Sequence, residues 1–141
     1  MYYNVSDLVK EKIGSNREWS IEPVNLNYAD LGLVKIQSGN FNLIKIDKGI
    51  WVEGLLEIVV NMNCIRCLNI LDVCMDINID EEYIYDDFMD KQFDDNFIID
   101  DSNHLSLREC LREYIFVTSP RKPVCKKCAN YDLINSLLNL L

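Results

Sequence analysis

Two stretches in the middle of the chain alternate between apolar and polar residues with a period of two. In the first, the apolar positions are Val52, Leu56, Ile58, Val60 and Met62, with Gly54 in phase. In the second they are Leu71, Val73, Met75, Ile77 and Ile79. This period is typical of a strand with one buried and one solvated face. The pattern therefore predicts an antiparallel hairpin of Val52–Asn63 and Leu68–Asp80, joined by a short tip that contains Cys64 and Cys67.

Shorter signals precede this hairpin. A weak amphipathic helix is expected over Val5–Ile13, with Ser6 as its N-cap and Gly14 as its break. Three strands follow it in the prediction: one around Trp19 and Ile21 that ends at Pro23, one over Leu31–Gln37, and one over Asn40–Asp47.

The C-terminal third favours helix. Leu107–Val117 has a broad apolar face, Ser106 and Glu109 have capping-box spacing, and Ser119-Pro120 should end the helix. A second short helix is expected over Asp132–Leu141. The length of 141 residues fits one domain. We therefore expect a single α+β domain over 1–141, with a twisted antiparallel sheet or meander, a C-terminal helix and two Cys-x-x-Cys knuckles.

Charge is distributed unevenly along this fold. The net charge is −9, which argues against a protein that coats nucleic acid. Eleven acidic residues lie between Asp76 and Asp101, opposed only by Lys91. We expect a long acidic loop over about 80–104, without sustained period from Tyr83 to Ser102. It is either a solvated loop or a docking surface for a basic partner, for which the candidates are Asp86, Asp87, Asp90, Asp94 and Asp95.

The cysteines carry the most specific signal. Cys64-x-x-Cys67 and Cys125-x-x-Cys128 are two thiolate pairs, and two such pairs complete the closed tetrahedral shell of a structural zinc site. Reduced thiols without metal and an iron–sulfur cluster remain the alternatives. Cys110 is expected in the core and Cys74 on the polar side of its strand.

Basic residues accompany the knuckles and the C-terminal third. They form a candidate RNA-contacting surface and comprise Arg66, Arg112, Arg121, Lys122, Lys126 and Lys127. Positive charge near the knuckles would also lower thiol pKa values.

Signals for catalysis are weak. The chain has one histidine, His104, and no Gly-rich phosphate loop, and no nucleophile has a base that the sequence places beside it. We expect no enzyme activity and no small-molecule substrate. The most apolar stretch, Ile50–Met62, contains Glu53 and Glu57 and is too short for a membrane span. No secretory leader is apparent, so a cytoplasmic location without membrane contact is expected.

The order of these motifs resembles a known family. The first elements of the resemblance are Asn4–Gly14 with Arg17-Glu-Trp19, and then Gly49-Ile-Trp-Val-Glu-Gly. The signature is Cys64-Ile-Arg-Cys-Leu68 at the end of an apolar strand, followed by Leu105-Ser-Leu-Arg-Glu and by Pro120-Arg-Lys-Pro-Val-Cys125. Over roughly Asn4 to Ala129 the chain is similar to the DUF177 family, also named YceD. It departs from that pattern after Cys128, where relatives often continue with a longer Cys-rich stretch.

The resemblance implies a role in 23S ribosomal RNA accumulation and assembly of the large ribosomal subunit. Two hypotheses follow for a chain of this charge. In the first, the protein binds a basic ribosomal protein or a pre-large-subunit particle through its acidic segment. In the second, a zinc-stabilised module contacts rRNA through its basic C-terminal region.

Overall fold

The structure is a computed structural model that describes residues 1–86 and 97–140. Its strands are β1 (Tyr2–Asn4), β2 (Asn16–Ile21), β3 (Val24–Tyr28), β4 (Gly32–Ile46), β5 (Gly49–Asn63), β6 (Ile70–Tyr85), β7 (Ile98–Ile99) and β8 (His104–Ser106). Its helices are α1 (Ser6–Val9), α2 (Arg108–Thr118) and α3 (Lys126–Asn139). Among the described residues, no helix is both long and apolar enough to cross a lipid bilayer.

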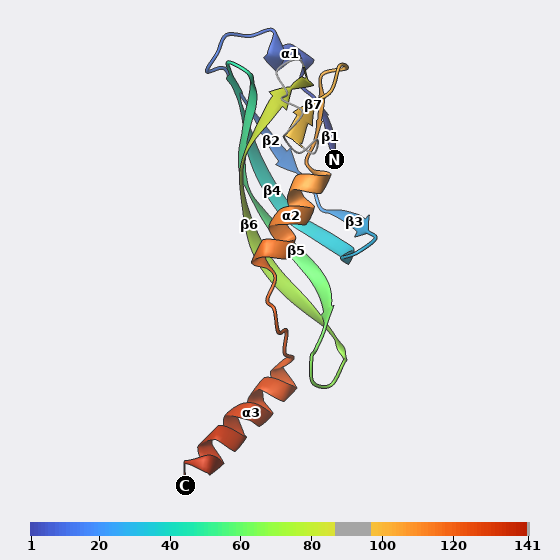
Figure 1. The fold of residues 1–141 in the computed structure, drawn as a ribbon, viewed down its shortest axis with the longest axis vertical. Coiled ribbons are helices and arrows are strands. Elements are labelled where there is room, and N and C mark those ends of the chain that lie inside the picture. Colours follow the sequence, from blue (N-terminus) through green and yellow to red (C-terminus); the bar gives the residue numbers. More distant parts are fainter. Residues whose placement is uncertain (87–96, 141) are drawn as a thin grey trace.

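One large sheet dominates the molecule. Its order is β2-β4-β5-β6-β7, β3 also pairs with β4, and a separate two-stranded sheet joins β1 to β8. All pairs are antiparallel except the short β6–β7 pair. In Figure 1 the strands form a long twisted layer, α2 lies alongside it, and α3 projects beyond the tip of the β5–β6 hairpin. The expected α+β class, with a mainly antiparallel sheet and a C-terminal helix, is confirmed.

The period-two pattern assigns the faces of the central hairpin correctly. β5 and β6 pair continuously from Gly49–Ile84 to Asn63–Ile70. The inner face packs its aliphatic side chains into the core together with the buried face of α2, and the fully buried members include Leu56, Ile58, Ile77, Ile79, Leu111 and Ile115. The alternation between faces follows from strand geometry alone, so the sequence pattern is sufficient to assign which side chains share a face.

Several boundaries differ from the sequence-based expectation. β6 continues to Tyr85, five residues beyond the expected end at Asp80, because the Tyr83 side chain is buried and its hydroxyl donates to the carbonyl of Ser106 at 2.7 Å. The segment expected to be an acidic loop therefore starts as strand, contains β7 and reaches the first residue of β8. Its central part, residues 87–96, lies outside the described residues.

The N-terminal half shows three further corrections. The two strands expected on either side of Ser38-Gly39 are one strand, β4, with a register shift between Ile36 and Ser38. A β-bulge of this kind lets a strand bend without ending. The polar residues around Ser38-Gly39 are also typical of a turn, so the sequence predicts two strands instead of one. The helix expected over Val5–Ile13 is shorter, because α1 ends at Val9. Its N-cap is Val5 rather than Ser6, whose hydroxyl donates to the side-chain oxygen of Asn4 instead.

The helical third also begins differently from the expectation. The residue at the N-cap of α2 is Leu107, and the Ser106 hydroxyl accepts from the backbone N–H of Arg108 at 3.3 Å. α2 ends at Thr118 with Ser119 as its C-cap, as the Ser-Pro pair predicts. α3 begins at Lys126, six residues before the expected start at Asp132.

Gly49 is a position at which the backbone of β6 leaves no room for a side chain on β5. A Cβ atom built there would lie 1.8 Å from the carbonyl oxygen of Tyr83, which is backbone and cannot rotate away. We expect Gly49→Ala to lower the free energy of unfolding by about 1–3 kcal/mol, because the strands must separate to admit the methyl group. Chemical denaturation measures this loss.

The neighbouring exposed residue gives the control. Lys48→Ala should change the free energy of unfolding by less than about 0.5 kcal/mol. Equal stability of the two variants would contradict the close approach at Gly49.

Candidate metal centre

Four cysteines from two distant parts of the chain meet beyond the end of the sheet. Cys64 and Cys67 belong to the turn between β5 and β6, and Cys125 and Cys128 lie at the start of α3. The four sulfur atoms all lie within 4.8 Å of one another. The structure therefore brings together all four residues that the spacing singled out, and such a cluster could hold a metal ion.

Backbone hydrogen bonds fix the geometry of the hairpin tip. Cys64 N–H donates to the carbonyl of Asn69 at 2.9 Å, and Leu68 N–H donates to the carbonyl of Cys64 at 3.0 Å. Leu68 has a φ of 63°, in the left-handed region that non-glycine residues seldom adopt. This tight turn places the Cys64 and Cys67 side chains on the same side of the tip.

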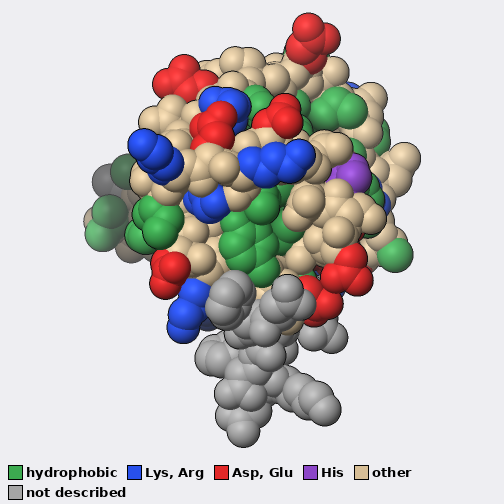
Figure 2. Space-filling view, turned by 90° about the horizontal axis from the view of Figure 1, so that it is seen from above, with side chains coloured by type: hydrophobic (Ala, Val, Ile, Leu, Met, Phe, Trp, Pro, Cys, Tyr) green, Lys and Arg blue, Asp and Glu red, His purple; other side chains and the backbone are tan. Residues whose placement is uncertain are grey.

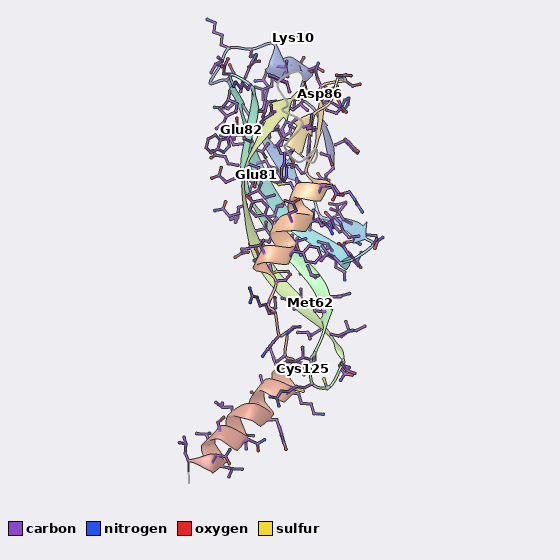
Figure 3. All side chains as sticks on the ribbon, viewed as in Figure 1. Lys10, Met62, Glu81, Glu82, Asp86 and Cys125 are labelled. Carbon is purple, nitrogen blue, oxygen red and sulfur yellow. The ribbon has the colours of Figure 1, made fainter. Side chains whose placement is uncertain are left out.

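The connector between α2 and α3 is bonded directly to this tip. Ile65 N–H donates to the carbonyl of Pro123 at 3.0 Å, and Cys125 N–H donates to the Cys64 sulfur at 3.4 Å. In Figure 3, Cys125 lies at the junction of the connector, the hairpin tip and α3. Contacts of the backbone, in addition to the thiols, therefore hold the two knuckles together.

Cys125 also starts the helix. Its sulfur accepts from the backbone N–H of Cys128 at 3.5 Å, which makes Cys125 the N-cap of α3. Interpretation of Cys125-x-x-Cys128 as a ligand pair alone puts the predicted helix start too late, at Asp132. A side-chain acceptor three residues before a backbone donor is also the spacing of a helix N-cap, and this signal could have revealed the boundary.

The thiols of the cluster differ in acidity. Hydrogen bonds from the backbone N–H groups of Cys125 and then of Cys67 lower the pKa of Cys64 to about 6. A hydrogen bond with the thiol of Cys125, followed by desolvation, raises the pKa of Cys128 to about 12. Close thiols oppose each other's ionisation because one thiolate repels the next. A divalent cation among them would remove that conflict.

The donor set fits a tetrahedral zinc ion. Zinc–sulfur bonds of about 2.3 Å in a tetrahedron put the sulfur atoms about 3.8 Å apart. The Cys67 and Cys125 sulfur atoms are 3.6 Å apart, and Cys64 is fully buried. Cys74 is exposed on its strand and Cys110 is buried in the core, both as the sequence predicts.

The six candidate RNA-contacting cations do not form one surface. Arg66, Arg121, Lys122, Lys126 and Lys127 are exposed at the tip, in the connector and at the start of α3. Arg112 instead lies on α2, where its Nε donates to Asp30 at 2.7 Å and its guanidinium stands 5.0 Å from the centre of the Phe116 ring. Arg112 therefore has a carboxylate partner within the fold.

The acidic docking candidates are only partly placed. Asp86 is exposed immediately after β6, and Asp87, Asp90, Asp94 and Asp95 lie outside the described residues. In Figure 3, Asp86 and Cys125 lie toward opposite ends of the molecule. Asp86 and the cysteine cluster are therefore separated.

The fold and the site together define a class. The chain is a small α+β protein in which a twisted antiparallel sheet carries a four-cysteine cluster beyond its longest hairpin. Residues 52–135 match the family described as large ribosomal RNA subunit accumulation protein YceD. The chain belongs to this YceD family.

The match covers β6, α2, both cysteine pairs and all of β5 except its first three residues. The N-terminal motifs of the resemblance, from Asn4 to Trp19, precede the matched range. No curated protein and no solved structure matches the chain in the other two comparisons.

The Arg112–Asp30 pair generates a prediction. The hydrogen bond from Arg112 holds the pKa of Asp30 below its ordinary value. The stabilising contribution of such a carboxylate is present above its ordinary pKa and is lost as the pH falls through the lowered value. We expect Arg112→Ala to return the pKa of Asp30 toward its ordinary value in an NMR titration.

The exposed Arg121 provides the matched control. Arg121→Ala should leave the titration of Asp30 unchanged. An Asp30 carboxyl that titrates identically in both variants would show that Arg112 is not held by this pair in solution.

Proposed function

We propose that the chain is a non-catalytic factor that promotes accumulation of 23S rRNA during large-subunit assembly by binding a basic ribosomal protein or a pre-ribosomal particle. Membership of the YceD family supports the ribosome-related role. We place this activity in the cytoplasm, within a single domain over 1–141, without a small-molecule substrate. The choice of a basic partner is supported by the charge of the sheet.

The outer face of the sheet, opposite the core, is strongly acidic. Strand alternation directs seven carboxylates from β2, β5 and β6 to this face, with Lys35 as the opposing cation among the described side chains of these strands and β4. The seven are Glu18, Glu53, Glu57, Asp72, Asp76, Asp80 and Glu82. Among the described residues, the strands therefore present an acidic surface on this face, and three of its carboxylates, Asp76, Asp80 and Glu82, belong to the acidic run of the sequence.

Two cross-strand pairs on this face carry the proposal. Glu53 stands directly opposite Asp80, and Glu57 directly opposite Asp76. Like charges at directly opposed positions destabilise a sheet. A basic partner would neutralise both pairs, and long-range attraction would speed its encounter with the protein.

Other parts of the molecule are less acidic than the outer face of the sheet. Figure 2, which looks down on the end that carries α1, shows both acidic and basic side chains. The cations of the tip, connector and α3 lie near the cysteine cluster instead. Their grouping there favours a second candidate function, in which this basic region contacts rRNA directly.

We assign one structural zinc ion to Cys64, Cys67, Cys125 and Cys128. A closed four-thiolate shell would lock the connector to the hairpin tip and would leave no position for substrate water. The hollows described on the surface are open to solvent, including one of about 480 Å³ beside Glu18 and Glu53. This openness supports a binding role rather than catalysis.

The zinc assignment predicts one ion per chain. Cys64→Ser should lower the zinc content of protein purified without chelator from one to near zero per chain. It should also abolish the rise in melting temperature that zinc gives to the parent protein, because the bound ion stabilises the folded state. Elemental analysis and thermal denaturation measure these two effects.

The matched control is the exposed cysteine outside the cluster. Cys74→Ser should keep one zinc per chain and the full thermal shift. A parent protein that binds iron, or no metal, would contradict the zinc assignment.

The partner hypothesis predicts opposite effects on stability and binding. The triple variant Glu53→Gln, Glu57→Gln, Asp76→Asn should raise the melting temperature of the free protein, because it relieves repulsion between carboxylates. It should weaken retention of purified basic ribosomal proteins by about tenfold or more at low salt, and added salt should remove the difference. A second variant tests the acidic segment by replacing Asp86, Asp87, Asp90, Asp94 and Asp95 with Asn.

Controls and a second bait separate the two candidate functions. Replacing Glu22 and Asp47, exposed acids that lie outside the strands, with Gln and Asn should leave binding unchanged. Naked rRNA serves as the second bait. Retention of rRNA but not of basic proteins, lost on replacing Lys122, Lys126 and Lys127 with Ala, would favour the RNA-contacting function.

A further inference from the structure

The helix α3 exposes an apolar surface that no other described element covers. Six large apolar side chains each leave more than half of their surface exposed: Tyr131, Leu133, Ile134, Leu137, Leu138 and Leu140. Figure 1 shows α3 projecting away from the sheet and from α2. The helix can therefore be approached by another molecule without obstruction from the body of the chain.

The apolar side chains gather on one side of the helix. They recur at spacings of three and four residues, as in Leu133, Leu137 and Leu140, and in Ile134 and Leu138. The polar residues Asn135, Ser136 and Asn139 occupy the other side. This amphipathic division holds from Tyr131 to Leu140, whereas Lys126, Lys127 and Asn130 at the start of the helix lie on the same side as the apolar residues.

Such a helix needs a partner to be stable. It has 14 residues, and isolated helices of this length are marginal in water, where packing of an amphipathic face supplies most of the stability. The cysteine cluster fixes only its first turn, through the N-cap Cys125. The remaining turns lack a packing surface within the described chain.

The charge of α3 argues against the partners proposed for the rest of the molecule. Residues 128–140 contain a single charged residue, Asp132. A basic protein would find no acidic surface there, and RNA would find no cation beyond Lys127. The face suits an equally apolar and nearly neutral surface, and the α3 of a second copy is such a surface.

We propose that two copies of the chain associate through their α3 helices, packed antiparallel. Each exposed apolar side chain leaves on the order of 100 Å² to be covered. Complete cover of all six in both copies would bury at most about 1,200 Å², the lower end of the range for specific interfaces. An interface of this size suits a weak dimer, which we expect to form only at micromolar or higher concentration.

The lysines at the start of α3 determine the antiparallel direction. In an antiparallel pair, Lys126 and Lys127 of each copy approach the C-terminal turn of the other helix, where the carbonyl groups carry partial negative charge. A parallel pair would bring the four lysines together. Direction therefore follows from charge, and affinity follows from the apolar face.

Sedimentation equilibrium of the full chain tests the proposal. The mass should rise from 16.5 kDa toward twice that value as the concentration increases through the micromolar range. Leu133→Glu with Leu137→Glu should abolish this rise. The matched control, Asn135→Glu with Asn139→Glu, adds the same charge on the polar side and should dimerise within about threefold of the parent protein.

A further variant tests the direction of the pair. Lys126→Glu with Lys127→Glu should weaken the antiparallel dimer by tenfold or more, because it puts carboxylates against the partial negative charge of the C-terminal turn. A parallel dimer should change little, because four like charges would meet in the parent and in the variant alike. Zinc content and circular dichroism of each variant verify that the cluster and the sheet are intact. A parent chain that stays at 16.5 kDa up to about 200 μM would overturn the proposal. The same follows if the Leu133→Glu, Leu137→Glu variant dimerises as well as the Asn135→Glu, Asn139→Glu control. Either result would leave the binding of basic proteins or rRNA unaffected.

Discussion

The register of β5 on β6 is the constraint on which the rest of the structure depends. The two strands pair without interruption from Gly49–Ile84 to Asn63–Ile70. A slip of one residue would exchange the faces of a strand and bring Glu53 or Asp76 into the core. At one end, only glycine fits beside the Tyr83 backbone, so Gly49 is compatible with this register and a larger residue is not. At the other end, the turn that begins at Cys64 fixes where the two strands stop pairing.

The helix α2 packs on this hairpin and thereby fixes where the connector to the C-terminal cysteines begins. The Tyr114 hydroxyl accepts from the backbone N–H of Asp80 and donates to its carbonyl, which covers part of the free edge of β6. The Tyr28 hydroxyl donates to the carbonyl of Arg108 at the start of the helix. With α2 held in this way, the short connector reaches the hairpin tip, and the two cysteine pairs meet.

The arrangement separates three kinds of surface. Carboxylates occupy the outer face of the sheet, cations surround the cysteine cluster, and the apolar face of α3 extends beyond both. A factor in ribosome assembly meets basic proteins and RNA in the same particle, so opposite charges at different sites would give each partner its own surface. An apolar contact, in contrast, depends little on salt, and it would persist while the charged contacts form and dissociate.

The sequence by itself determined the parts of this protein that local periodicity controls. Alternation assigned the buried and exposed faces of β5 and β6, the Ser-Pro pair ended α2, and the two Cys-x-x-Cys spacings identified the cysteines that converge. The zinc ion, the partner and the single domain remain proposals. Local signals suffice for these faces and boundaries because they depend on the repeat of the strand or helix itself.

Only the tertiary structure decided the remaining features, since they depend on contacts between distant residues. The bulge that keeps β4 continuous and the burial of Tyr83 that extends β6 both require neighbouring strands or segments. The cross-strand pairs Glu53–Asp80 and Glu57–Asp76 exist only in one register. The sequence showed Arg112 as one cation among six, whereas the fold gave it Asp30, a carboxylate 82 positions away. Contacts between residues far apart in the sequence leave no periodic pattern in it, so tertiary packing determines which of them form.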